Sequence, residues 1–162
     1  MMFKLVTYSF LISVSLSSCI PSYSANPKEY NRAKVNFTRQ KAFVENKELE
    51  REFNILKHSD IYEIVEDSTN AAKITLHPME TRTPSCGNPM IGSMITVGLL
   101  PSGFPYDISY RYDVTENSTT KNYQYQLKVY QSLWLFNIFR VGRTFSKQSG
   151  KALLGSYMAS NK

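Results

Sequence analysis

The stretch "YDISYRYDVTENSTTKNYQYQLKV", residues 106–129, carries the clearest structural signal in the chain. Apolar or aromatic residues alternate with polar ones over residues 106–115 and again over residues 123–129. This period of two is typical of strands with one buried and one wet face, and the polar stretch between the two runs suits a turn. We therefore predict an antiparallel hairpin whose tyrosines are mainly structural. A ligand-binding aromatic face is the alternative.

Weaker patterns before the hairpin predict four further strands. Ala33, Val35 and Phe37 alternate with polar residues. Residues 72–76 show the same alternation, with apolar residues at the even positions and polar residues at the odd ones. Short apolar runs at residues 61–65 and 94–101 complete the set, because runs of this length bounded by polar or Pro/Gly residues are consistent with buried strands. The intervening residues 78–93 are rich in Pro and Gly and predict a loop.

Two segments predict helices. Leu49, Phe53 and Leu56 recur at helical spacing between charged residues, which predicts an amphipathic helix over residues 45–57. Near the end of the chain, Ser146 can cap a second helix. Together these elements predict an α+β fold: a mainly antiparallel sheet of about five or six strands with two helices packed on one face.

The N-terminus has the layout of a secretory signal peptide. Lys4 is followed by an apolar run from Leu5 to Leu16, which is shorter than the ~20 residues that a membrane-spanning helix needs. Two small residues follow, and then Cys19. We expect residues 1–18 to be a signal peptide, 19–31 a lipidated N-terminus and flexible tether, and 32–162 a single domain.

The run Leu16-Ser17-Ser18-Cys19 resembles the lipobox of bacterial lipoproteins. The resemblance implies that the thiol of Cys19 is acylated, with fatty chains such as palmitate, and that the chain is cut just before it. Because Ile20 follows Cys19, it also implies sorting to the periplasmic side of the outer membrane if the host is Gram-negative. The alternative is a plain N-terminal membrane anchor with an incidental cysteine.

A second resemblance concerns the segment "ITVGLLP", which follows a cysteine-containing loop. It is similar to the "TLGLIP"-like strand of a broad group of uncharacterised small envelope lipoproteins. Val97 and Leu100 depart conservatively from that pattern. If Cys19 is lipidated, Cys86 has no intramolecular disulfide partner, so it is a bystander, a reactive thiol or a link to another protein.

Charge is distributed unevenly along the chain. Residues 20–116 contain 13 acidic and 11 basic residues, whereas residues 117–162 contain 7 basic residues and no acidic one. A basic end on a lipid-anchored protein suits an anionic membrane surface or an acidic envelope polymer. Nucleic acid is not expected as a partner, because an exported lipoprotein rarely meets it.

No arrangement of residues in the sequence indicates an enzyme, a metal or a cofactor. A Cys–His site would need His77, Cys86 and Asp107 to meet in space, and no catalytic motif surrounds them. Four carboxylates could bind calcium weakly but are better explained as a solvated edge: Asp60, Glu63, Glu66 and Asp67. An envelope hydrolase is therefore the weakest of the function classes considered.

The most unusual stretch is "SLWLFNIFRVGR", residues 132–143, which is almost entirely apolar before its two arginines. It is too short to span a bilayer as a helix. One interpretation is a connection buried on both sides. The other is an exposed loop that enters the lipid interface or binds a protein, with the following contact residues: Trp134, Phe136, Phe139, Arg140 and Arg143.

The sequence thus predicts a non-enzymatic, lipid-anchored protein of the cell envelope. We expect it to act by binding another envelope component or the membrane surface. The alternative is an inhibitor or immunity lipoprotein that neutralises a toxin or lytic enzyme in the periplasm.

Overall fold

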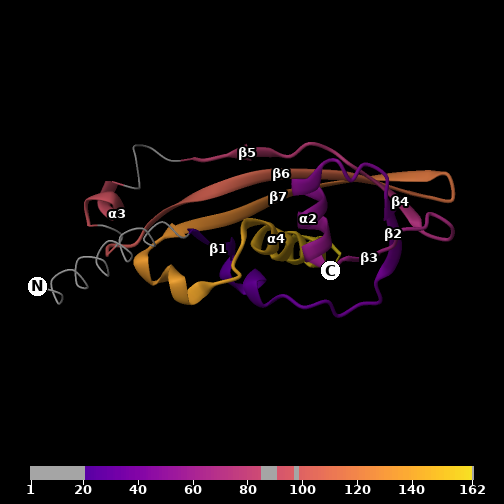
Figure 1. Cartoon of the computed structure of the whole chain (residues 1–162). Coiled ribbons are helices and arrows are strands. Elements are labelled where there is room, and N and C mark those ends of the chain that lie inside the picture. Colours follow the sequence, from indigo (N-terminus) through magenta and orange to yellow (C-terminus); the bar gives the residue numbers. More distant parts are fainter. Residues whose placement is uncertain (1–20, 85–90, 97–98, 162) are drawn as a thin grey trace, which may run out of the picture.

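One curved sheet and the helices packed against it make up the structure, a computed structural model that describes residues 21–84, 91–96 and 99–161 (Figure 1). The strand order is β1-β7-β6-β4-β2-β3, and β5 also pairs with β6. The strands are β1 (Pro21–Asn26), β2 (Gln40–Val44), β3 (Tyr62–Ile64), β4 (Ala72–Leu76), β5 (Glu80–Arg82), β6 (Ser102–Glu116) and β7 (Thr119–Leu133).

The β6–β7 hairpin is the longest feature of the sheet and confirms the predicted hairpin. Its register runs without interruption from Ser102 opposite Leu133 to Glu116 opposite Thr119. Asn117 and Ser118 form the turn, with φ angles of 48° and 65°. Two consecutive residues at positive φ are the signature of a type I′ turn, whose twist matches that of the flanking strands.

The sheet is mixed, so the prediction of a mainly antiparallel sheet of five or six strands is wrong in these details. β2 runs parallel to both β3 and β4, whereas every pairing of β6 and β7 is antiparallel. The β2–β3 pair is parallel because helix α2 (Glu50–Ser59) connects the two strands. Parallel neighbours require such a crossover, since a tight turn cannot join them.

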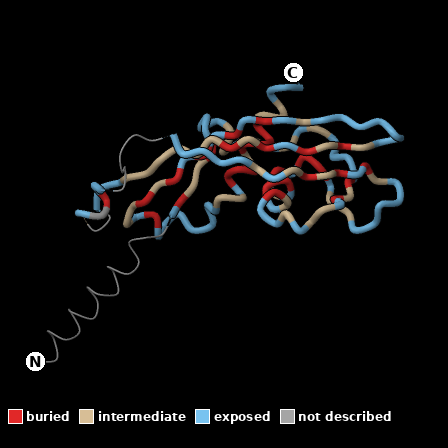
Figure 2. The backbone as a smooth tube through the Cα atoms, turned by 90° about the horizontal axis from the view of Figure 1, so that it is seen from above, coloured by how far each residue is buried: buried red, intermediate tan, exposed pale blue. Residues whose placement is uncertain are grey.

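Helices α2 and α4 (Phe145–Ser160) lie on the same face of the sheet and pack against each other (Figure 1). Figure 2 shows the buried positions running along the middle of the molecule, with the tip of the β6–β7 hairpin exposed. Three shorter helices complete the described chain: the 3-10 helices η1 (Lys28–Arg32) and η2 (Leu135–Arg140), and α3 (Ile91–Ile95).

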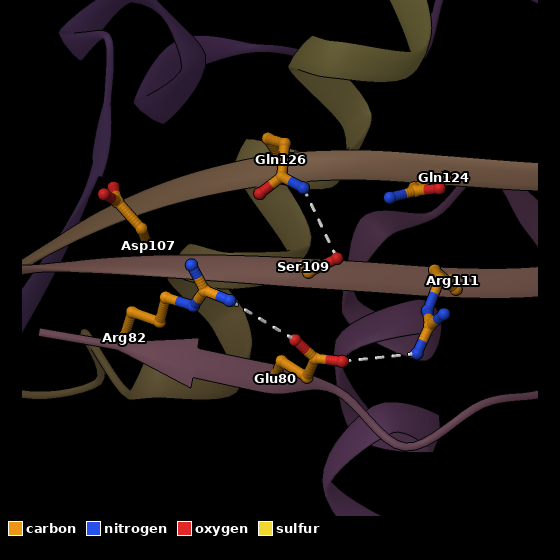
Figure 3. A pocket seen from close by; sticks show the side chains of 7 residues that line it. All are labelled: Glu80, Arg82, Asp107, Ser109, Arg111, Gln124 and Gln126. Carbon is orange, nitrogen blue, oxygen red and sulfur yellow. Dashed lines mark hydrogen bonds and ion pairs between the residues drawn. The ribbon is translucent and has the colours of Figure 1, made fainter.

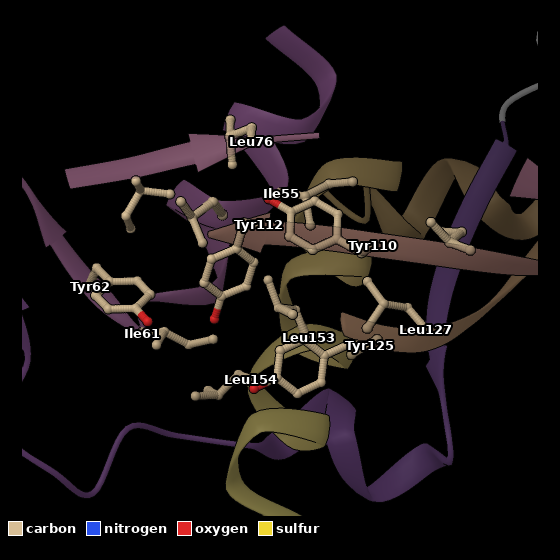
Figure 4. Close-up of a cluster of buried hydrophobic side chains, with 14 of the residues drawn as sticks. Ile55, Ile61, Tyr62, Leu76, Tyr110, Tyr112, Tyr125, Leu127, Leu153 and Leu154 are labelled. Atoms are coloured by element: carbon tan, nitrogen blue, oxygen red, sulfur yellow. The ribbon is translucent and has the colours of Figure 1, made fainter. Parts of the chain in front are cut away.

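Tyrosines of the hairpin form much of the core between sheet and helices (Figure 4). Tyr110 and Tyr112 are fully buried, and the hydroxyl of Tyr110 donates a hydrogen bond of 2.8 Å to the backbone oxygen of Glu52 in α2. The ring of Tyr112 stacks on that of Tyr123, its cross-strand partner, with centroids 5.2 Å apart. Edge and stacked ring contacts of this kind add to the energy of burial. The tyrosine ladder is therefore structural.

The N-terminal region is more ordered than a flexible tether. Pro21–Asn26 is strand β1, paired along its whole length with β7. The Pro- and Ser-rich composition of this segment does not predict a strand. The strand forms because its backbone pairs with the much longer β7. The side chain of Asn31 also accepts from the backbone nitrogen of Ala25 and donates to its oxygen, at 3.0 and 2.9 Å. That amide closes the turn after β1.

The structure differs from two predictions made for the first half of the chain. Ala33, Val35 and Phe37 form no strand; they pack partly buried against the core from an extended connection. The predicted helix over 45–57 begins only at Glu50. The earlier residues are held by the side chain of Asn46, which bonds both the backbone oxygen and nitrogen of Leu76, at 2.7 and 2.8 Å.

The strand predicted over residues 94–101 is wrong where the structure describes it, since Ile91–Ile95 forms helix α3. Short apolar runs do not distinguish a strand from a helix by periodicity alone.

The predicted loop over residues 78–93 contains strand β5. Thr144 rather than Ser146 caps α4, because its hydroxyl accepts from the backbone nitrogen of Lys147.

We predict that Gly150→Ala destabilises the protein, although alanine favours a helix more than glycine does. A Cβ at position 150 would lie 2.6 Å from the backbone carbon of His58, so α2 and α4 would have to separate. The expected loss in the free energy of unfolding is about 1–3 kcal/mol, measured by urea denaturation. Gly92→Ala is the control, because nothing lies within 4 Å of its Cβ. Equal stability of the two variants would contradict the packing described here.

A second prediction concerns alkaline pH. Burial raises the pKa of the hydroxyls of Tyr62, Tyr110 and Tyr112 well above their ordinary value. The unfolded chain ionises its tyrosines near pH ~10, so the free energy of unfolding should fall as the pH rises above that value. Urea denaturation between about pH 8 and pH 11 measures the fall, and Tyr110→Phe should make it less steep. A fall that is unchanged in that variant would contradict the assignment.

Candidate functional site

A shallow polar hollow lies on the open face of the sheet, where β5, β6 and β7 run side by side (Figure 3). Its volume is about 400 Å³. We call it the outer groove, and it is lined by Glu80, Arg82, Asp107, Ser109, Arg111, Gln124 and Gln126.

The groove follows directly from the alternation within the hairpin. Ile108 and Tyr110 are buried against the helices, so their neighbours on β6 point to the opposite side. The strand register places Gln126 and Glu80 on either side of Ser109, and Gln124 beside Arg111. One side of the hairpin therefore supplies core tyrosines and the other a row of polar side chains.

Several groove residues bind one another. The Glu80 carboxylate lies 3.6 Å from the Arg111 guanidinium and 4.0 Å from that of Arg82, and Gln126 donates to the hydroxyl of Ser109 at 3.4 Å. The side chains of Asp107 and Gln124 form no hydrogen bond or ion pair with any other described residue. They offer a free carboxylate and a free amide to a ligand.

A second hollow of about 320 Å³ continues the groove along β6 and β7 and shares Arg111 and Gln124 with it. Here the His77 ring and the Asp113 carboxylate form a hydrogen bond of 2.9 Å. His77 therefore pairs with Asp113 rather than with Asp107, its partner in the Cys–His hypothesis. Cys86 lies outside the described residues.

The four carboxylates considered for calcium do not converge. Asp60 pairs with Arg39 at 3.6 Å, and Asp67 accepts from the backbone nitrogen and hydroxyl of Thr69. A hydrogen bond from Lys47 lowers the pKa of Glu66. Among the residues that the structure describes, no group of three metal-binding side chains is close enough to hold an ion.

The stretch after β7 is exposed, so the interpretation of residues 133–141 as a buried connection is wrong for most of its side chains. Phe136 is 46% exposed, Phe139 81% and Val141 85%, although Asn137 is fully buried. The guanidinium of Arg140 lies 5.7 Å from the centre of the Trp134 ring. Aromatic side chains beside an arginine are a usual combination at membrane and protein interfaces.

A second apolar segment lies against this stretch and was missed in the sequence. The indole nitrogen of Trp134 donates to the backbone oxygen of Leu99 at 3.1 Å. The exposed apolar residues of this second segment are Ile91, Ile95, Leu99 and Leu100. Its signal in the sequence was the lack of any charged residue over 91–106.

Both segments adjoin the start of β1. Leu133, the last residue of β7, lies opposite both Pro21 and Ser102, the first residues of β1 and β6. The backbone nitrogen of Tyr23 donates to the oxygen of Arg143 at 3.1 Å. Of the sequence-predicted site residues, Trp134, Phe136, Phe139, Arg140 and Arg143 therefore share one end of the sheet, whereas Cys19 lies outside the described residues.

Comparison with known proteins gave no match, either to a protein-family model or to a curated protein sequence. The helices in the described ranges are all too short or too polar to cross a membrane.

We predict that Asn137→Ala loosens the stretch after β7 without unfolding the domain. The buried amide of Asn137 donates to the backbone oxygen of Ser132 at 2.7 Å, and leaving that oxygen unpaired costs about 1–3 kcal/mol. Trp134, the only tryptophan, should become more accessible to acrylamide quenching. Asn161→Ala removes a similar but exposed bond to Tyr157 and should leave quenching unchanged. Equal quenching in both variants would contradict this role of Asn137.

Proposed function

We propose that this protein is a non-enzymatic lipoprotein of the cell envelope that is anchored through Cys19 and binds another envelope component. In a Gram-negative host it would be exported and held at the periplasmic side of the outer membrane. Two features support the proposal: the position of β1 relative to Cys19, and the polar groove on the open face of the sheet.

The observation that carries the proposal is the pairing of Pro21 with Leu133. Cys19 precedes Pro21 by two residues, and two Cα–Cα steps span at most ~7–8 Å. A lipid on the sulfur of Cys19 would therefore hold this end of the sheet at the membrane surface. The outer groove would then be displayed beside the membrane on a rigid strand pair, rather than on a freely moving domain.

The chemistry of the outer groove favours a polar ligand of low net charge. Two carboxylates, on Glu80 and Asp107, balance two guanidiniums, on Arg82 and Arg111. Such a balance gives little attraction to a polyanion such as nucleic acid, whose binding depends on an excess of positive charge. The free groups of Asp107 and Gln124 suit hydrogen bonds to a protein backbone or to polyhydroxyl groups.

Fatty-acid labelling tests the anchor. Cells expressing the chain with labelled palmitate should give a labelled protein in the outer-membrane fraction, and Cys19→Ala should abolish the label. Cys86→Ala is the matched control and should leave it intact, because Cys86 is the only other cysteine. An unlabelled wild type, or label that depends on Cys86, would overturn the lipoprotein proposal.

Site-specific crosslinking tests the binding face. A photoreactive amino acid at position 124 in the groove should give a defined adduct in cells, whereas the same group at the exposed position 57 on α2 should not. Asp107→Ala should reduce the adduct, because it removes a free carboxylate. No adduct, or equal adducts from both positions, would contradict the proposal. An adduct with a toxin or lytic enzyme would favour an inhibitor or immunity lipoprotein.

A further inference from the structure

We propose that the exposed apolar residues around η2 and α3 form a docking surface for a phospholipid bilayer with anionic headgroups. This surface, the apolar end, comprises Ile91, Ile95, Leu99, Leu100, Trp134, Phe136, Ile138, Phe139 and Val141. The inference rests on the proposed function, since it names the surface that the anchored protein lays against its membrane.

Exposed apolar side chains are concentrated at this end of the molecule. Of the large hydrophobic residues that are exposed in the described chain, all but Tyr130 belong to the apolar end. Single exposed hydrophobic residues are ordinary, but a contiguous group marks an interaction surface. Ile95 and Phe139, from segments more than forty residues apart, are 76% and 81% exposed.

The charges around the apolar end fit an anionic bilayer. Residues 91–106, 129–143 and 21–27 contain no acidic residue, and Arg140 and Arg143 are their only charges. Both arginines are exposed. Arg140 directly follows Phe139, and Arg143 lies three residues further on. Arginines can contact phosphate groups while neighbouring apolar side chains enter the interface, and Trp is enriched at that depth. A partner protein with a basic surface would instead require acidic residues at the apolar end.

The N-terminal continuation of the chain points to the same occupant. β1 begins at this end, beside Leu133, and α3 lies at the same end, opposite the tip of the β6–β7 hairpin (Figure 1). A lipid chain on Cys19 would enter the bilayer at this end of the sheet, because Cys19 precedes Pro21 by only two residues. The lipid alone fixes only the point of attachment, so a second membrane contact would fix the orientation of the domain on the bilayer.

Trp134 provides a direct readout, because it is the only tryptophan and lies within the apolar end. The full-length protein, purified from a host that acylates lipoproteins, is reconstituted into vesicles of equal parts phosphatidylcholine and phosphatidylglycerol. Lipids brominated near the headgroup end of the acyl chains should quench Trp134 strongly, and its emission should shift to shorter wavelength. Fatty-acid label on the same sample reports the anchor independently.

Variants test which side chains dock the apolar end to the bilayer. Phe139→Ser and Ile95→Ser should each lower the ratio of docked to undocked protein by about tenfold, because each removes one large apolar group from the interface. Tyr130→Ser is the control and should leave quenching unchanged, since Tyr130 lies on the open face of β7. Unchanged melting temperatures show that the exposed substitutions leave the fold intact.

The outcomes separate this inference from the proposed function. Labelled protein whose Trp134 is not quenched would overturn the docking surface and leave the anchor in place. Unlabelled protein whose Trp134 is quenched would overturn the anchor and support docking. A wavelength shift that depends on protein concentration without vesicles would assign the apolar end to contacts between copies of the chain, and would overturn the bilayer as its occupant.

Discussion

The fixed register of the β6–β7 hairpin is the constraint on which the rest of the structure depends. Its turn uses two residues at positive φ, Asn117 and Ser118, and the strands then pair over their whole length. β1 adds to one edge of this hairpin, and β4 and β5 add to the other. A slip of one residue would turn the tyrosines to solvent and the polar row toward the helices. The core and the outer groove therefore depend on the same register.

The hairpin also separates the two ends of the molecule. At one end the chain turns within two residues, and at the other β1, β6 and β7 all begin or end around Leu133. The segments that continue from these strands have to meet there. Trp134, just before η2, therefore donates a hydrogen bond to Leu99, which lies between α3 and β6, although the two residues are distant in sequence. A lipid on Cys19 would join the same end, so the fold itself links the proposed anchor to the exposed apolar residues.

The sequence predicted those elements whose stability is encoded locally. The hairpin and β4 follow from strict alternation, and α2 from helical spacing of its apolar residues, although Asn46 delays its start. β1 was missed because its strand structure comes from pairing with β7, and Ala33–Phe37 was over-interpreted because alternation without a partner strand gives no ladder. The apolar stretch after β7 was singled out, with burial and exposure both left open. Its partners around Leu99 were missed, since only the tertiary structure brings the two segments together.

Neutron reflectometry of the acylated protein on a supported bilayer tests the central claim most directly. β6 has 15 residues, so a protein docked through its apolar end should form a layer about 50 Å thick, with the hairpin tip farthest from the lipid. A sheet lying flat on the bilayer, with its single layer of helices roughly 10 Å thick, would give a layer no thicker than about 30 Å. The account predicts the thicker layer. A thin layer, or protein density that is detached from the headgroups, would contradict it.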